Sequence, residues 1–407
     1  MSSANTALAH DKPKKKRPYL LEIDLMRACI MFSVVAVHVS SFINAKTANL
    51  SHLNLSLEAA LSSLHYTREA FMFITGIVLF ITYYNRPTSI LAFWKKRFAF
   101  IAVPYIGWTI LYILFEGMYV HNFNWSIGPL SHKIFHALIT GNQFFLYYVL
   151  VTMQLYVVFP ALVALLRKLE RHHMTLLIGS FILQIAMMVF NKEVLQVVDV
   201  YKLPGWIAWL DHYRDRFVLT YQFWFVAGGL LAIHYDKVKA WVEARRRMIL
   251  YVFLGMTAIL WGHLLLDRLV LHETDDMAIS VLQPIMIPYS FITAVLLWQV
   301  GRIWVANQAS VPSFINYILK FFSKHSFGIF LLHPFGLHYA EIVLNKLHWP
   351  HWGLTLLILP TVVVIYACAG LVAAGLSNLP ALSYLVGRRY TRRNNLRLVN
   401  ASTSKSA

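Results

Sequence analysis

Charged residues are scarce in this chain of 407 residues. Only 13% are Asp, Glu, Lys or Arg, whereas 58% are hydrophobic. An average globular domain carries about 25% charged residues. A soluble protein of this length has too little interior for so much apolar surface, and here the apolar residues fall in long runs. The composition therefore indicates a protein that crosses a membrane many times.

Acidic residues and cysteines are also few. There are 18 Asp and Glu against 36 Lys and Arg, which gives a formal net charge of +18. In a soluble chain this imbalance would suggest nucleic acid as a partner. The basic residues instead lie in tails and short loops, so we interpret them as topology anchors and expect no nucleic acid. Cys29 and Cys368 fall inside apolar runs without a Cys-x-x-Cys spacing, so neither a disulfide framework nor a metal site is predicted.

Ten apolar runs are long enough to cross the hydrocarbon layer as helices, which takes about 20 residues each. The first run carries Glu22, Asp24 and Arg27 and lacks a clear cleavage site, so we interpret it as a retained span and not as a signal peptide. The sequence predicts an all-α, polytopic transmembrane bundle with spans at 19–42, 65–84, 97–118, 143–166, 174–192, 217–235, 248–267, 278–300, 322–344 and 353–377.

The distribution of lysine and arginine predicts the orientation of the bundle. If the N-terminus is cytoplasmic, 26 of the 36 basic side chains lie in cytoplasmic segments and 8 in outer ones. The positive-inside rule thus favours ten spans with both termini in the cytoplasm. The predicted domains are a basic tail at 1–18, a membrane domain at 19–380 and a second basic tail at 381–407. A short interfacial helix is expected at Leu130–Thr140 in an outer loop.

Arg27 and His38 are ionisable residues inside the first span. Such a residue costs about 2.5–3.5 kcal/mol at a helix centre on insertion scales and usually faces protein or a water-filled cavity. Eleven helical steps of about 100° place both side chains on one face, about 16 Å apart along the axis. The spacing leaves open that Arg27 extends to the interface and that His38 is a satisfied core histidine.

The second and third spans contain further candidates. Arg68 and Glu69 are adjacent and cannot face each other on a helix, so Glu69 either pairs across the bundle or caps the helix start. Thr75-Gly76 indicates close helix packing. Lys96 and Arg97 precede the third span, either as a topology anchor or as a cationic mouth for a phosphate-bearing ligand.

His333 is the candidate of the ninth span. It precedes Pro334, which is expected to kink the helix and to free a backbone carbonyl. A buried histidine at a kinked helix often lines a cavity, although a purely structural role stays open.

Six segments in order resemble the acyltransferase-3 family of bacterial integral membrane acyltransferases, from Leu21 to about Pro380. The family's first span carries an arginine and a histidine with ten residues between them, as Arg27 and His38 are. The other matching segments are Arg68–Gly76 (REAFMFITG), Lys96-Arg97-Phe98 with Pro104-Tyr105, Gln154–Pro160, Tyr221–Gly229 and Ser326–Pro334.

The resemblance implies an enzyme that transfers acyl groups other than aminoacyl groups. It implies transfer of an acyl group, commonly acetyl, from cytosolic acyl-coenzyme A to a hydroxyl of a cell-surface or lipid-linked glycan, at the bacterial plasma membrane. Acyl-coenzyme A would be a co-substrate, with no permanently bound cofactor.

The resemblance also suggests roles for the candidate residues. His38 would act as general base, with Glu69 orienting it or the sugar. Arg27, Lys96 and Arg97 would bind the donor's phosphates, and Arg68 and His333 would line the substrate cavity. Three alternatives stay open: a polysaccharide exporter, a different membrane acyltransferase fold with a histidine in an apolar span, and an accessory subunit without activity.

Overall fold

The structure, a computed structural model, describes residues 19–390 apart from 87–88, 198, 200–201 and 203. The predicted tail at 1–18 and residues 391–407 of the second predicted tail lie outside the described residues. Every regular element of the described part is helical. The α-helices are α1 (Leu21–Asn44), α2 (His52–Leu64), α3 (Thr67–Tyr83), α4 (Ile90–Phe98), α5 (Ala102–Tyr119), α6 (Ile127–Thr140), α7 (Tyr147–Lys168), α8 (His173–Phe190), α9 (Gly205–His212), α10 (Gln222–Ile233), α11 (Tyr235–Ala244), α12 (Arg246–Leu269), α13 (Asp275–Ala278), α14 (Met286–Ala306), α15 (Ser313–Lys346), α16 (His351–Leu356) and α17 (Ile358–Ser377).

The prediction of a polytopic bundle with about ten spans is confirmed. Within the described residues, nine helical segments are long and apolar enough to cross a membrane, and a bent pair makes ten. The bent pair consists of Val218–Ile233 and Tyr235–Ala244, which meet at 96°. The sixth predicted span, 217–235, therefore ends where the chain turns into α11.

Two segments differ from the predicted ones. The span expected at 278–300 starts only at Met286, because Pro284 disfavours helical geometry in the residue before it. The predicted outer loop 43–64 contains α2, which is capped by Ser51, whose side chain accepts a hydrogen bond from the Asn54 amide. A helix is present where the interfacial one was expected, as α6.

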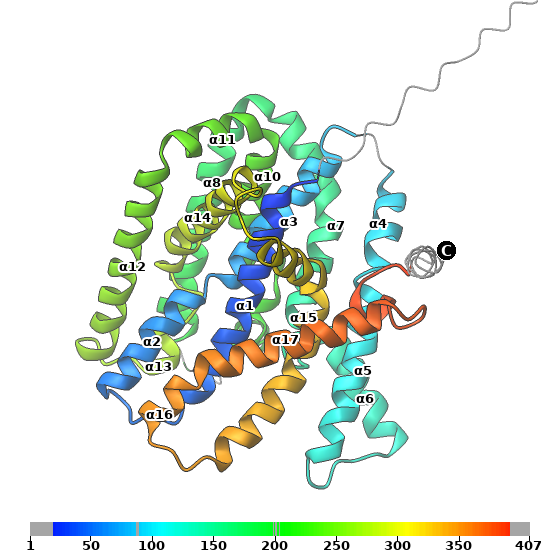
Figure 1. Cartoon of the computed structure of the whole chain (residues 1–407), viewed down its shortest axis with the longest axis vertical. Coiled ribbons are helices and arrows are strands. Elements are labelled where there is room, and N and C mark those ends of the chain that lie inside the picture. The colour runs from blue at the N-terminus through cyan, green and yellow to red at the C-terminus, as the bar shows by residue number, and fades with distance from the viewer. Residues whose placement is uncertain (1–18, 87–88, 198, 200–201, 203, 391–407) are drawn as a thin grey trace, which may run out of the picture.

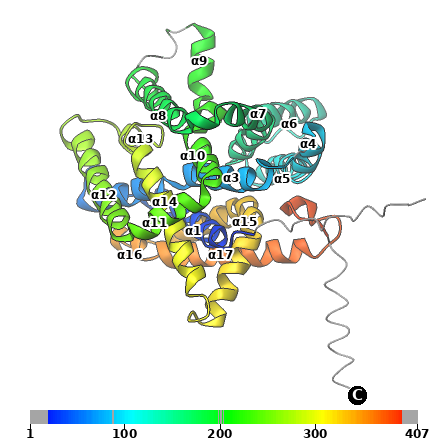
Figure 2. The same ribbon diagram turned by 90° about the horizontal axis from the view of Figure 1, so that it is seen from above.

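Helix α1 runs through the middle of the bundle, as Figures 1 and 2 show. It packs against α2, α3, α14, α15, α16 and α17. Helices α8 and α12 lie at the periphery, where only 17% of each span's apolar window is buried. Polar side chains on α1 are therefore surrounded by protein, whereas α8 and α12 present apolar surface to lipid.

Helices α3 and α10 approach each other most closely through glycines. A Cβ atom on Gly76 would lie 2.4 Å from the Phe225 carbonyl oxygen, and one on Gly228 would lie 2.0 Å from the Phe73 carbonyl oxygen. Both contacts are to backbone, which cannot move aside without separating the helices. The close packing predicted from Thr75-Gly76 is present, and it forms the layer between the site around α1 and the peripheral helix α8.

Replacing Gly228 with Ala is expected to destabilise the folded protein by about 1–3 kcal/mol, because the added methyl overpacks the α3–α10 contact. Thermal melting of the protein in detergent micelles measures the effect. Gly255→Ala on α12 is the matched control, since its Cβ would meet nothing within 4 Å. Equal melting temperatures for the two variants would contradict the interpretation.

Candidate active site

Arg27 and His38 project from α1 toward opposite ends of the bundle. We call the end that holds the start of α1 the Arg27 end and the opposite one the His38 end. Both side chains are half-buried within the bundle. Helix α11 lies at the Arg27 end, because the Tyr235 hydroxyl donates a hydrogen bond to the Glu22 carboxylate.

His38 lines a cavity of about 410 Å³ at the His38 end. The Phe145 ring stacks on the imidazole with ring centroids 3.8 Å apart. Phe145 is held by the turn between α6 and α7, in which Phe144 adopts a φ of 46°. Such backbone strain in a non-glycine residue costs about 1–3 kcal/mol and persists where the surrounding structure enforces it. The turn thus places two aromatic rings at the cavity that His38 faces.

His333 lies beside His38, with ring centroids 5.6 Å apart. Pro334 has no amide hydrogen, so the Phe330 carbonyl lacks its helical partner. The Nδ1–H of His333 donates to this carbonyl at 2.7 Å, which leaves Nε2 as the nitrogen without a proton in the neutral ring. Nε2 is buried and has no partner among the described residues. His333 is fully buried behind the cavity and does not line it.

Arg68 lines the same cavity and links it to the segment that precedes α10. Its guanidinium donates to the hydroxyls of Tyr147 at 2.9 Å and Tyr221 at 3.4 Å. The Tyr221 hydroxyl donates in turn to the Asp215 carbonyl at 3.0 Å. Arg68 and His38 thus line the same cavity, and their side chains lie within electrostatic range of each other.

A second cavity of about 390 Å³ adjoins the first through Arg68, Asp215 and Arg216. Charged side chains form most of its lining, including Asp211 and Arg214, which form an ion pair with each other. Sequence reasoning counted these residues only as outer-loop charges. The dense run of charges at 211–216 was the signal that could have singled them out.

Glu69 is fully buried, and neither carboxylate oxygen has a hydrogen-bond partner among the described residues. It does not line the His38 cavity, and the nearest opposite charge is that of Arg68. The described contacts of His38 are with Phe145 and His333 and do not include Glu69. The role expected for Glu69, orienting His38 or a sugar, thus has no direct contact to support it.

The Arg27 end holds a cluster of positive charge. Arg27 lies within electrostatic range of Asp24, Tyr156 and Arg97. The Arg97 guanidinium lies over two rings, 5.2 Å from the centroid of Tyr83 and 5.8 Å from that of Tyr156. Asp24 accepts hydrogen bonds from the hydroxyls of Tyr19 and Ser323, and one carboxylate facing two guanidiniums leaves a net positive charge.

Lys96, the third residue expected to contact the donor, is exposed at the surface of α4. It lies next to Arg97 in the chain but outside the contacts that join Arg27, Arg97 and Tyr156. The structure therefore brings two of the three predicted donor residues together.

Aromatic side chains line part of the cavity at the His38 end. Phe71, Tyr148 and Phe330 line the His38 cavity, and Arg27 does not. The Tyr148 ring centroid lies 6.2 Å from that of Phe71 and 6.1 Å from that of Phe330. Arg27 and His38 thus share one helix face, and an aromatic layer of Phe71, Tyr148 and Phe330 lines the cavity at His38.

Comparison with known proteins assigns the chain to a family. The profile of the acyltransferase-3 family, described as an acyltransferase domain, matches residues 20–373. Comparison with curated proteins and with solved structures returned no significant match. The match spans all the candidate residues from Arg27 to His333 and nearly the whole helical bundle, so this multi-pass membrane protein belongs to the acyltransferase-3 family and is an acyltransferase.

Proposed function

We propose that the protein is an O-acyltransferase of the bacterial plasma membrane. It moves an acyl group, most simply acetyl, from cytosolic acyl-coenzyme A to a hydroxyl of a cell-surface or lipid-linked glycan. The observation that carries the proposal is the arrangement along α1, with a cationic cluster at Arg27 and a cavity at His38. In this proposal the Arg27 end is cytoplasmic, which agrees with the basic residues of α11 and its flanks at that end.

The Arg27 end suits a donor that carries phosphates. Planar guanidinium groups donate two hydrogen bonds to one phosphate, and the Nε of Arg97 is buried without a partner among the described residues. Arg27 and Arg97 would bind the phosphates, with exposed Lys96 adding positive potential at the entrance. The approximate 16 Å from Arg27 to His38 along the helix then lets an extended donor reach toward the cavity.

The His38 end suits a sugar. A sugar offers apolar ring faces, which pack on aromatic rings, and hydroxyls, which hydrogen-bond to charged and polar side chains. The cavity provides Phe144, Phe145 and Tyr147 for the first kind of contact and Arg68 and Asp215 for the second. This mixed lining supports a polyhydroxylated acceptor better than an apolar one.

The chemistry follows from the position of His38. Its imidazole removes the proton from an acceptor hydroxyl as the oxygen attacks the thioester carbonyl. The new carbon–oxygen bond forms, the carbon–sulfur bond breaks, and the imidazolium returns the proton to the departing sulfur of coenzyme A. His333 lies close enough to stack beside the imidazole and helps to set its orientation.

The aromatic layer makes the reaction depend on motion. In this proposal Tyr148 and Phe330, which line the cavity with ring centroids 6.1 Å apart, close it toward Arg27, so the thioester reaches His38 only when these rings move apart. A closed layer also keeps acyl-coenzyme A away from water at the His38 end, which limits hydrolysis of the thioester. The same layer argues against an open path for polysaccharide export.

The purified protein in lipid vesicles is expected to consume acetyl-coenzyme A only when an acceptor glycan is present. Arg27→Gln is expected to raise the KM for the donor about tenfold or more, because a charge-assisted phosphate contact contributes about 1.5–3 kcal/mol. The release of free thiol measures consumption, and mass analysis of the glycan identifies the ester formed.

Lys320→Gln is the matched control, since Lys320 is an exposed basic residue outside the Arg27 cluster. It should leave the KM unchanged. Glycan flux into vesicles without any consumption of acyl-coenzyme A would contradict the proposed acyl transfer and favour an exporter. Equal KM values for the parent and Arg27→Gln would show that Arg27 does not contribute to binding of the donor.

A further inference from the structure

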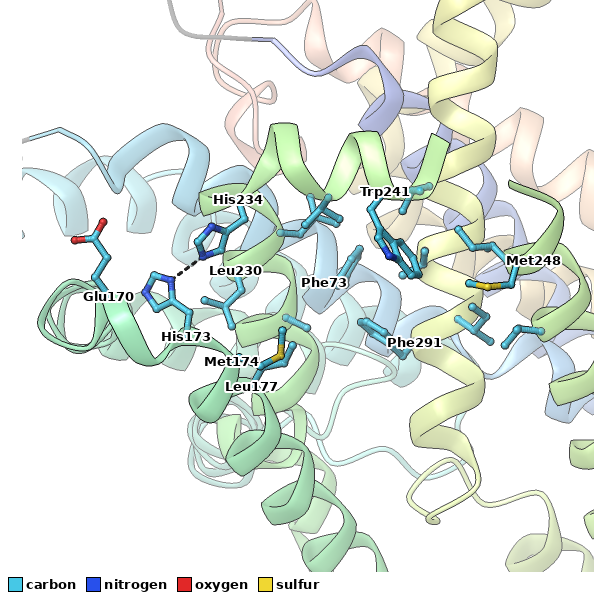
Figure 3. Close-up of a pocket in the computed structure, with 18 of the residues that line it drawn as sticks. Phe73, Glu170, His173, Met174, Leu177, Leu230, His234, Trp241, Met248 and Phe291 are labelled. Atoms are coloured by element: carbon cyan, nitrogen blue, oxygen red, sulfur yellow. Dashed lines mark hydrogen bonds between the residues drawn. The ribbon is translucent and has the colours of Figure 1, made fainter. Parts of the chain in front are cut away.

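An apolar groove lies on the side of the molecule away from α1, between the peripheral helices α8 and α12. Its volume is about 620 Å³, and α3, α10 and α14 provide its floor. Figure 3 shows Phe73, Leu230 and Phe291 lining this floor. The rim residues Met174 and Val252 are 68% and 44% exposed, so in a membrane the groove faces lipid. Some apolar chain must therefore occupy it.

Polar residues gather at one end of this groove. Glu170, Arg171, His173 and His234 line it where α8 begins and α10 ends, at the Arg27 end. The Nε2–H of His173 donates to the Leu166 carbonyl at 2.8 Å. In a neutral ring Nδ1 of His173 then carries no proton, so it accepts a hydrogen bond from the Nε2–H of His234, also at 2.8 Å (Figure 3). The pair fixes the His234 ring at the groove's polar end.

The charge around this end is predominantly positive. Arg171 is exposed, and Lys237 lies within electrostatic range of His234. Helix α11 bends by 96° from α10 and carries Lys237 and Lys239, and the three arginines 245–247 follow it. Helix α11 also carries two acidic residues, Asp236 and Glu243, and Glu243 forms an ion pair with Arg302. Arg245 lies 5.0 Å from the centroid of the Trp241 ring, which itself lines the groove.

A second lipid-facing groove provides a contrast. It lies between α7 and α8, has a similar volume of about 640 Å³, and is lined by residues such as Val158, Leu165 and Leu183. No ionisable side chain belongs to its lining. Bilayer lipids of any kind fill such a surface equally well, so the charged end distinguishes the groove between α8 and α12.

We infer that the groove between α8 and α12 is a specific site for an anionic phospholipid of the leaflet at the Arg27 end. One acyl chain lies on Phe73, Leu230 and Phe291, and the phosphate lies at the polar end, near Arg171 and Lys237. An anionic headgroup gains about 1 kcal/mol for each nearby lysine or arginine, whereas a zwitterionic one gains little. The groove shares no lining residue with the His38 cavity, and the inference does not depend on acyl transfer.

Native mass spectrometry of the detergent-solubilised full chain tests the site. The protein is equilibrated with phosphatidylglycerol and phosphatidylcholine of identical acyl chains, and the bound lipids are counted. The parent is expected to retain phosphatidylglycerol preferentially. Arg171→Gln is expected to weaken phosphatidylglycerol retention about fivefold and to leave phosphatidylcholine unchanged. Val252→Trp, which fills the groove, is expected to abolish the preferential retention.

Val158→Trp is the matched control, because it adds the same side chain to the uncharged groove and should leave the preference intact. Melting temperatures of both tryptophan variants report whether they remain folded, and Arg171→Gln alters only an exposed side chain. Equal retention of the two lipids by the parent, or an unchanged preference in Arg171→Gln, would overturn the inference. Displacement of the lipid by tail-free glycerol phosphate would assign the charged end to a soluble phosphate instead.

Discussion

Replacing His38 with Ala is expected to lower the rate of acyl transfer by about 10²–10⁴-fold while the protein stays folded. A sugar hydroxyl is a poor nucleophile at neutral pH, and two histidines, His38 and His65, line the cavity with Arg68. Nδ1 of His65 is hydrogen-bonded to the Ile279 carbonyl at 2.9 Å, whereas His38 makes ring contacts with Phe145 and His333. The His38 side chain is half-buried next to that cavity and makes no hydrogen bond to a described residue. Its removal therefore enlarges an existing space without leaving a buried polar group unpaired. Single-turnover measurement of ester formation separates the chemical step from donor binding.

His338→Ala is the matched control for this prediction. His338 lies on α15, five residues after His333, and its ring stacks on Tyr119 at 4.3 Å and not on the cavity residues. The control should transfer acyl groups at the parental rate. Full activity in the His38 variant would exclude the imidazole as the base, even if the membrane topology and the family assignment stand.

Replacing Lys192 with Met is expected to destabilise the protein by about 3–5 kcal/mol, because it leaves buried carboxylates without their cation. Lys192 Nζ lies 2.7 Å from an Asp267 oxygen and 3.2 Å from a Glu273 oxygen, and the side chains of Lys192 and Asp267 are only 7% and 2% exposed. These contacts join the end of α8 to the end of α12. Denaturant titration in detergent micelles measures the free energy of unfolding.

The double variant Lys192→Met with Asp267→Leu is expected to recover part of the lost stability, since apolar residues of similar size can replace a buried ion pair, while Glu273 still lacks its cation. Glu116→Ala tests the opposite case, because the Lys133–Glu116 pair has side chains 37% and 27% exposed and contributes only about 0–1 kcal/mol. A loss below about 1 kcal/mol for the single Lys192 variant would show that water reaches this cluster.

The helical membrane architecture could be predicted from the sequence because the bilayer constrains each span separately. Each span must be apolar over its own length and must satisfy its own backbone hydrogen bonds, so span number is a local property. The segment at 278–300 was placed too early, because hydropathy ignores the effect of Pro284 on the backbone. Residues 235–244 were assigned to a cytoplasmic loop, although they form the helical arm of a bent pair.

Helical periodicity likewise placed Arg27 and His38 on one face, because that relation lies within a single helix. The position of His333 directly before Pro334 also identified that histidine and predicted a freed carbonyl, although not that the His333 ring satisfies this carbonyl. The sequence left two interpretations of Arg97 open, a topology anchor and a residue that binds the phosphates of the acyl donor. The side chains that surround Arg97 come from other helices, so the sequence alone does not specify them. Only the tertiary structure shows that Arg97 lies within electrostatic range of Arg27 while Lys96 is exposed.

The sequence by itself determined the helical membrane architecture, the paired polar residues of α1 and the family. The tertiary structure alone decided that Phe145 stacks on His38, that the charges at 211–216 adjoin its cavity, and that Lys192 is buried against Asp267. The physical reason is that side chains far apart in the chain meet only once the helices pack. No local pattern of hydropathy or spacing specifies which helix faces meet.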